Sequence, residues 1–185
     1  MAHQELLKLL KQFAMRDDED SAAARLFESF VREHSDCAQR ELQIGHLTGS
    51  AWLVSADGAR ILLTHHRKLN RWLQLGGHAD GDSDLANVAL REAEEESGLT
   101  DLSVESEIFD LDRHWIPDRG NEPGHWHYDM RFVVRANGSE VFAVSDESHA
   151  LQWREISAIA ADRDADESLQ RMANRWLKRG AFGMR

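Results

Sequence analysis

Hydrophobic residues near the start of the chain recur at helical spacing in two groups. The first group comprises Leu6, Leu7, Leu9, Leu10 and Phe13, and the second comprises Leu26, Phe27, Phe30 and Val31. A polar run over residues 17–21 separates the groups, and its aspartate and serine side chains are typical of a helix N-terminus. The pattern predicts a helical hairpin within residues 1–40 that packs on the rest of the protein, and a dimerisation arm is the alternative.

Short apolar segments separated by turn residues follow from residue 51 onward. Residues 51–54 and 61–64 flank a turn at Asp57-Gly58, which is typical of a β-hairpin. Further strand-like segments cover residues 73–75, 104–111, 126–135, 141–144 and 151–154. A final helix is expected over about 166–178, because one helical face there carries Leu169, Met172, Ala173, Trp176 and Leu177. Strands with helices before, between and after them predict an α/β sandwich over residues 45–185.

Composition narrows the class of protein. The 185 residues suffice for one globular domain with a small appendage. The hydrophobic content of 42% and the charged content of 30% are typical of soluble proteins. Cys37 is the single cysteine, which excludes an internal disulfide and a cysteine-rich zinc site. The net charge is −11 and no basic stripe is present, so duplex nucleic acid is not an expected partner.

Hydropathy also indicates the cellular compartment in which we expect the protein. No apolar run approaches the roughly 20 residues that a membrane-spanning helix needs. The first residues lack the basic and apolar regions of a signal peptide. We therefore expect a cytoplasmic protein with no membrane partner.

A strongly acidic helix is expected over residues 85–97. Its start is marked by three capping residues, Asp82, Ser83 and Asp84, and Gly98 is a typical residue just past a helix end. At 100° per residue, the apolar stripe that begins at Leu85 continues into Glu92 and Glu96, with Glu95 at its edge. The opposite face carries Glu94, which should be solvated.

Carboxylates that continue an apolar stripe favour a metal-binding site. A hard cation such as Mg²⁺ accepts several carboxylate ligands and shares them with substrate phosphates. Arg91 is the one cation in this helix and cannot neutralise all three of its neighbours, Glu92, Glu95 and Glu96. The alternative is a solvated acidic face, which is the usual explanation of a charge run.

These residues resemble the Nudix box, whose pattern is G-x5-E-x7-R-E-U-x-E-E-x-G-U, with U a bulky apolar residue. The matching positions are Gly77, Arg91, Glu92, Glu95, Glu96, Gly98 and Leu99, in register and without a gap. Ser83 replaces the first glutamate of the pattern, and the small Ala93 occupies an apolar position. Asp82 or Asp84 could take over from the missing glutamate, and helix angle favours Asp84, which shares an edge with Arg91.

The resemblance implies a Nudix-like α/β/α sandwich with a mixed sheet, preceded by the helical hairpin, and a catalytic domain at 45–185. It implies a metal-dependent pyrophosphohydrolase that cleaves a nucleoside diphosphate linked to another moiety, of the nucleotide sugar or ADP-ribose type. Mg²⁺ or Mn²⁺ would be held by Glu92, Glu96, Glu95 and the carbonyl of Gly77, with Arg91 and Glu95 as catalytic candidates.

Alternatives to this reaction stay open. Within the enzyme class, they are hydrolysis of nucleoside triphosphates or of dinucleoside polyphosphates. A non-catalytic nucleotide-sensing or protein-binding module is the alternative of another class, but the intact glutamates argue against it. A homodimer is compatible with the sequence.

Two further features extend the candidate site. Glu147 lies in a loop before a predicted strand, where family members often supply an extra catalytic carboxylate; a solvated loop acid is the alternative. Along residues 125–131, one strand face carries His125, His127, Asp129 and Arg131. We predict that His125, His127 and Asp129, together with His78, bind substrate. The alternative is a solvated polar surface over an apolar core.

Overall fold

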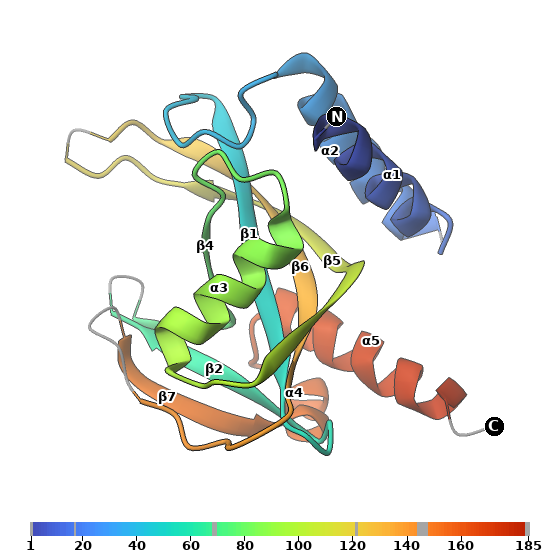
Figure 1. The fold of residues 1–185 in the computed structure, drawn as a ribbon, viewed down its shortest axis with the longest axis vertical. Helices are drawn as coiled ribbons and strands as arrows, with labels where there is room; N and C mark the ends of the chain where they lie inside the picture. Colours follow the sequence, from blue (N-terminus) through green and yellow to red (C-terminus); the bar gives the residue numbers. More distant parts are fainter. Residues whose placement is uncertain (1, 17, 68–69, 121, 144–147, 184–185) are drawn as a thin grey trace.

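The computed structural model describes residues 2–16, 18–67, 70–120, 122–143 and 148–183 (Figure 1). Its helices are α1 (Ala2–Ala14), α2 (Asp18–Glu33), α3 (Leu85–Ser97), α4 (Ile156–Ala161) and α5 (Glu167–Gly183). Its strands are β1 (Gly45–Val54), β2 (Arg60–His66), β3 (Arg71–Leu73), β4 (Leu75–His78), β5 (Leu102–Ile116), β6 (His125–Ala136) and β7 (Ser148–Glu155). Most expected elements are present, although several are longer than the sequence pattern indicated.

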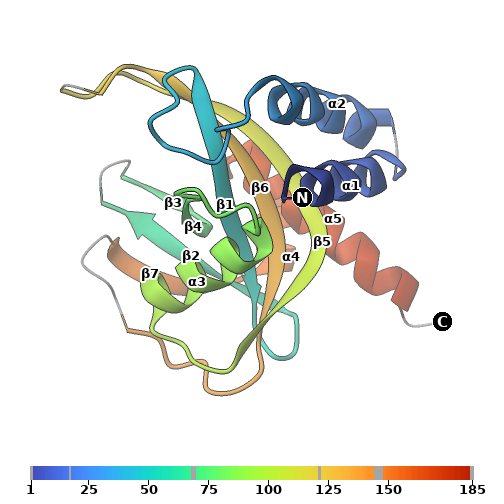
Figure 2. The same ribbon diagram turned by 45° about the horizontal axis from the view of Figure 1, so that its top comes forward.

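The described strands form one seven-stranded mixed sheet. The main path is β3-β2-β1-β6-β5, while β4 pairs with β1 and β7 pairs with β2. β1 and β6 are parallel from Gly45↔Trp126 to Val54↔Arg135, and the other pairings are antiparallel. Helices cover both sides of this sheet (Figures 1 and 2). The predicted α/β/α sandwich, with a mixed sheet and an N-terminal helical pair, is therefore confirmed.

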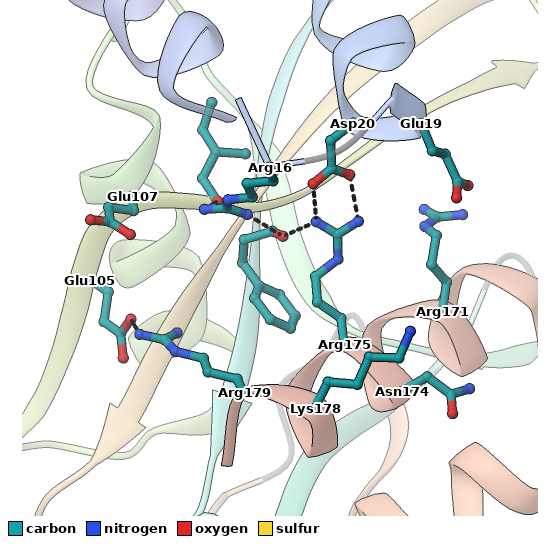
Figure 3. A pocket seen from close by; sticks show the side chains of 12 residues that line it. Arg16, Glu19, Asp20, Glu105, Glu107, Arg171, Asn174, Arg175, Lys178 and Arg179 are labelled. Atoms are coloured by element: carbon teal, nitrogen blue, oxygen red, sulfur yellow. Dashed lines mark hydrogen bonds and ion pairs between the residues drawn. The ribbon is translucent and has the colours of Figure 1, made fainter. Parts of the chain in front are cut away.

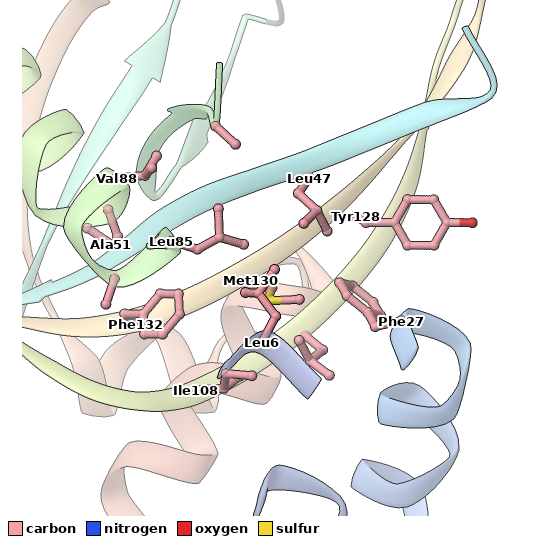
Figure 4. Packing of buried hydrophobic residues seen from close by; sticks show 14 of the residues in the cluster. Leu6, Phe27, Leu47, Ala51, Leu85, Val88, Ile108, Tyr128, Met130 and Phe132 are labelled. Atoms are coloured by element: carbon pink, nitrogen blue, oxygen red, sulfur yellow. The ribbon is translucent and has the colours of Figure 1, made fainter. Parts of the chain in front are cut away.

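Two hydrophobic cores lie on opposite faces of the sheet. In the larger core, helices α1, α2 and α3 pack against inward side chains of β1, β5 and β6, which include Leu47, Tyr128, Met130 and Phe132 (Figure 4). The smaller core joins Trp52 of β1 and Ile61 of β2 to α4 and α5. Because β1 contributes alternate residues to each core, it is buried along its whole length.

A glycine lets α3 approach the sheet closely. A Cβ atom on Gly49 would lie 2.9 Å from both the carbonyl oxygen of Leu85 and Cγ1 of Val88. Real side chains essentially never make contacts that short, so a larger residue would push the helix outward. The position of α3, and hence of its glutamates, depends on this glycine.

The N-terminal hairpin, formed by α1 and α2, packs through aromatic rings against the sheet face that also carries α3. The ring of Tyr128 stacks on Phe30 with 3.8 Å between centroids and meets the edge of Phe27 at 5.3 Å. Arg16, just after α1, donates to the carbonyl oxygens of Ile108 and Phe109 in β5. These contacts attach the two helices to β5 and β6.

A hollow of about 580 Å³ lies where the hairpin, β5 and α5 meet (Figure 3). Its lining contains opposite charges joined in pairs. Arg175 donates from both terminal nitrogens to Asp20, at 2.8 and 2.6 Å, and Arg179 pairs with Glu105. The Asp20 side chain is only 4% exposed. We interpret this hollow as the ion-paired seam between the hairpin and α5.

Asp20→Ala should lower the free energy of unfolding by about 2–4 kcal/mol, because it leaves the half-buried Arg175 guanidinium without its bidentate partner. Urea denaturation measures this loss. Glu5→Gln is the control, since Glu5 and Lys8 form an exposed ion pair whose removal should cost less than about 0.5 kcal/mol. Equal losses in the two variants would contradict the assignment of the seam.

Two expectations about individual elements need correction, and one helix was not predicted. Residues 141–143 are not a strand, and Val144 lies outside the described residues. The segment instead covers the end of α3, where the Ala143 amide donates to the carbonyl oxygen of Ser97 at 2.8 Å. The expected hairpin of 51–54 with 61–64 is present but short, with Val54↔Ile61 as its register pair, because β4 pairs with β1 up to Ala51 and β3 pairs with β2 from Thr64. Helix α4 was not anticipated.

None of the described helices has both the length and the apolarity to cross a membrane.

Candidate active site

Helix α3 has the bounds that its capping residues predict. The Asp84 carboxylate accepts from the Asn87 amide at 3.1 Å, and Asp82 accepts from the Asp84 amide at 2.9 Å. At the other end, Gly98 is left-handed, with φ 66°, and its amide donates to the carbonyl oxygen of Glu94. Both aspartates therefore hold the loop and the helix start.

Arg91 makes its ion pairs within the helix. Its guanidinium lies 3.3 Å from Glu92 and 3.9 Å from Glu95, and it also reaches the carbonyl oxygen of His78 at 3.5 Å. The described ion pairs of Arg91 thus do not include Asp84, which sequence reasoning favoured as the substitute for the missing box glutamate. Asp84 instead acts as the N-cap.

The glutamates of α3 point where the helix angle places them. Glu96 is 8% exposed and accepts from the Gly76 amide at 2.8 Å. Glu92 lies against Gly77, where an added Cβ would be 2.5 Å from its Oε2. The Glu95 side chain is 65% exposed, beside this pair. Glu94 is exposed on the other side of the helix.

The donor set suits a hard divalent cation. Carboxylate oxygens gathered on one and a half helical turns are the ligands that an ion such as Mg²⁺ or Mn²⁺ prefers. Gly77 keeps the space next to Glu92 clear, because any side chain there would displace the carboxylate. The residues present therefore fit such an ion.

A pocket of about 660 Å³ opens on the other side of β4. Gly76 and Gly77 line it and also contact Glu96 and Glu92, so this short strand joins the acidic helix to the pocket. The wall also contains the substrate-binding candidates His78, His125, His127 and Asp129. Among the described residues, the glutamate side chains themselves are not part of the lining.

Histidines from four strands gather at this wall, with His78, His114, His125 and His127 in the lining and His46 buried behind them. The parallel register places His46 opposite His127, and the antiparallel register places His114 opposite His127. Ring centroids of His46 lie 4.8–5.0 Å from those of His78, His125 and His127. Sequence reasoning missed His46. The signal was available, because His46, Thr48 and Ser50 alternate with Leu47, Gly49 and Ala51.

Burial keeps three of these imidazoles neutral, those of His127, His46 and His78. Burial, reinforced by neighbouring histidines, lowers the pKa of His127 to about 2 and that of His46 to about 4. Burial also lowers the pKa of His78, and the nearby Arg40 adds to the effect. At neutral pH each of these rings therefore carries one N–H donor and one free lone pair.

Below the histidines, β6 continues into a buried ionic network. Asp129, 1% exposed, accepts from Thr48, Ser50 and Arg131 at 2.8–2.9 Å. Arg131, 2% exposed, also contacts two aspartates of β5, Asp110 and Asp112. The interpretation of this strand face as a solvated polar surface is therefore wrong for Asp129 and Arg131, while His125 and His127 are partly buried at the pocket. Glu147 lies outside the described residues.

Residues 46–175 match the NUDIX domain family, so the chain belongs to that family. It is a Nudix-type hydrolase acting on phosphoric anhydride bonds. Enzymes of this family generally need divalent cations. No curated protein matches the sequence significantly.

Several solved structures share the fold. A Caenorhabditis elegans Ap4A hydrolase has a TM-score of 0.58 and 16% identity, over 74% of this chain and 98% of that one. A MutT protein from Methanosarcina mazei Go1 has a TM-score of 0.56 and 16% identity, over 75% and 97%. The dihydroneopterin triphosphate pyrophosphohydrolase of Escherichia coli has a TM-score of 0.54 and 17% identity, over 70% and 92%.

Proposed function

We propose that this hydrolase cleaves the diphosphate of a nucleoside diphosphate linked to another moiety, of the nucleotide sugar or ADP-ribose type. One observation carries the proposal. The Gly76-Gly77 backbone contacts the α3 carboxylates on one side and lines a pocket of about 660 Å³ on the other. A diphosphate at this strand would lie within reach of both the acidic helix and the pocket, which would hold the linked groups.

The charged residues of α3 that face β4 have separate roles in this proposal. Glu92, Glu96 and the Gly77 carbonyl would hold Mg²⁺ or Mn²⁺, which supplies charge neutralisation and water activation when bound. The exposed Glu95 carboxylate would accept the proton of the attacking water. Arg91, through its contacts with Glu92 and Glu95, would orient both carboxylates.

The pocket wall would recognise the rest of the substrate. Its lining includes Arg119, an exposed residue whose guanidinium suits phosphate oxygens. His78, His125 and His127 would contact the substrate through their ring nitrogens. Asp129 would act mainly by fixing Arg131, because its oxygens already accept several hydrogen bonds.

Product analysis tests the reaction. The purified chain, incubated with Mg²⁺ or Mn²⁺ and a panel of nucleotide sugars, ADP-ribose, dinucleoside polyphosphates and nucleoside triphosphates, should act best on the first two groups. The products should be a nucleoside monophosphate and a phosphorylated second moiety, because each half keeps one phosphorus after water attack. Chromatography with mass detection identifies them.

Other outcomes of the panel correspond to the alternatives. Preference for a triphosphate or a dinucleoside polyphosphate would contradict the proposed substrate class. It would remain consistent with the proposed metal site on α3. Tight nucleotide binding without turnover, with either metal, would instead indicate a non-catalytic sensing module. Chelation of the metal with EDTA should abolish all turnover if the acidic helix holds it.

A further inference from the structure

Three neighbouring histidines, of which His125 and His127 line the pocket and His46 is buried beside them, bring ring nitrogens close to one another. His46 and His127 face each other across the parallel β1–β6 pair, and His125 lies two residues before His127 on the same strand face. One ring nitrogen from each residue lies within 4.8 Å of the other two. A tetrahedral ion with metal–nitrogen bonds of 2.0–2.1 Å needs its ligand nitrogens about 3.3 Å apart. Small rotations of the imidazole rings would bring the three nitrogens to that separation.

His46 is the least satisfied member of this cluster. Its side chain belongs to a residue that is 2% exposed, yet neither Nδ1 nor Nε2 has a hydrogen-bond partner among the residues that the structure describes. A buried polar atom without a partner costs about 1–3 kcal/mol. A ligand bound at one nitrogen of His46 would offset that cost.

The tautomer of His125 is set from outside the cluster. Its Nδ1 lies 2.9 Å from the carbonyl oxygen of Pro123, which can only accept, so Nδ1 carries the proton. The lone pair of its Nε2 then points at Nε2 of His127, 3.2 Å away. Zinc-binding histidines typically show this arrangement, in which one nitrogen donates to a carbonyl and the other faces the ion.

We propose that His46, His125 and His127 form a second metal site that binds a borderline divalent cation such as Zn²⁺. Imidazole nitrogens without a carboxylate suit Zn²⁺ and not Mg²⁺, which prefers oxygen ligands. Three protein ligands leave a fourth position open. Because His125 and His127 line the pocket, that position faces the space where a water or a phosphate oxygen can bind. The site does not depend on the proposed substrate.

Metal binding to the metal-free full chain tests this site. Titration calorimetry with Zn²⁺ should show one equivalent bound with a dissociation constant below about 1 μM, and Co²⁺ should give the visible spectrum of a tetrahedral complex. His125→Gln and His127→Gln change partly exposed residues, and each should weaken Zn²⁺ binding at least ~100-fold. His46→Ala should do the same, with circular dichroism to check its fold.

Two control variants separate this site from the acidic helix. His34→Gln, at the end of α2, should leave Zn²⁺ affinity unchanged. Glu96→Gln should also keep the Zn²⁺ equivalent, whatever it does to hydrolysis. Absence of Zn²⁺ binding at ~100 μM by the folded wild type would overturn the proposal, as would unchanged binding in His125→Gln and His127→Gln. Loss of the equivalent in Glu96→Gln would move it to the carboxylates of α3.

Discussion

Replacing Glu96 by glutamine should lower the Mg²⁺-supported kcat at least ~100-fold, a loss of about 2.7 kcal/mol of transition-state stabilisation. The substitution removes a charge that we assign to the metal. The glutamine oxygen can still accept from the Gly76 amide, which Glu96 contacts at 2.8 Å, so the helix should stay in place. Steady-state kinetics on the substrate identified by product analysis measure the loss, and circular dichroism checks the fold.

Glu94→Gln is the matched control for this experiment. It removes the same charge from the same helix, but Glu94 is exposed and points away from Gly76 and Gly77. Its kcat should stay within about twofold of the wild type, because exposed charges contribute little. Without metal, Glu96→Gln should melt no lower than the wild type, since Glu92 and Glu96 repel each other at i,i+4. Retention of wild-type turnover in Glu96→Gln would remove the metal assignment.

Arg131→Met should lower the free energy of unfolding at pH 7 by about 3–5 kcal/mol. Arg131 is 2% exposed and joins Asp129 at 2.8 Å, Asp112 at 3.2 Å and Asp110 at 3.3 Å. Burial by itself would lower the pKa of Arg131, but the three carboxylates outweigh burial and raise it. Methionine fills a similar volume and leaves these carboxylates to repel one another. Urea denaturation measures the change.

The effect of Arg131→Met should shrink as the pH falls toward 4. Burial alone would raise the pKa of Asp112, but His114, Arg131 and Arg171 together hold it well below its usual range. Such a carboxylate stabilises the fold above the unfolded-state pKa of about 3.9, and this contribution is lost as the pH falls through the folded-state pKa. In the variant, Asp112 loses the Arg131 charge and takes up a proton at higher pH, which relieves its repulsion with the neighbouring carboxylates.

Arg135→Met is the control for the ionic network. Arg135 lies on the same strand, but its side chain is 39% exposed and pairs with Glu105, which is 26% exposed. Its replacement should cost about 1 kcal/mol or less and should show little pH dependence between 4 and 7. Similar costs for the two arginines would show that the network contributes no more than a surface ion pair.

Local sequence patterns predicted α3 well, because the information lies within the helix. The cap at Asp84, the stop at Gly98 and the inward direction of Glu92 and Glu96 all depend on residues less than two turns away. The same holds for the hairpin helices, whose apolar spacing predicted faces that now pack against β5 and β6. In contrast, the apolar residues at 141–143 suggested a strand that the backbone does not form.

Strand pairing decided what the local pattern left open. Alternation along residues 125–131 placed two histidines, Asp129 and Arg131 on one face, but the pattern of one strand does not show what covers that face. The parallel register with β1 brought His46 opposite His127, and the register with β5 brought Asp112 opposite Asp129. Those partners lie far away in the sequence, and their approach turned a polar strand face into a buried wall.

The sequence by itself determined the family, the fold class and the face of the acidic helix on which Glu92 and Glu96 lie. Helix caps, hydrophobic periodicity and the spacing of the box residues are all local patterns that can be read from neighbouring residues. The tertiary structure alone decided that Asp84 serves as N-cap while Arg91 pairs with Glu92 and Glu95. It also decided that β4 separates the carboxylates from the pocket, and that the His46 ring contacts those of His78, His125 and His127. Each of these outcomes depends on which distant strands pair and in which register, since the register sets which side chains meet across the sheet.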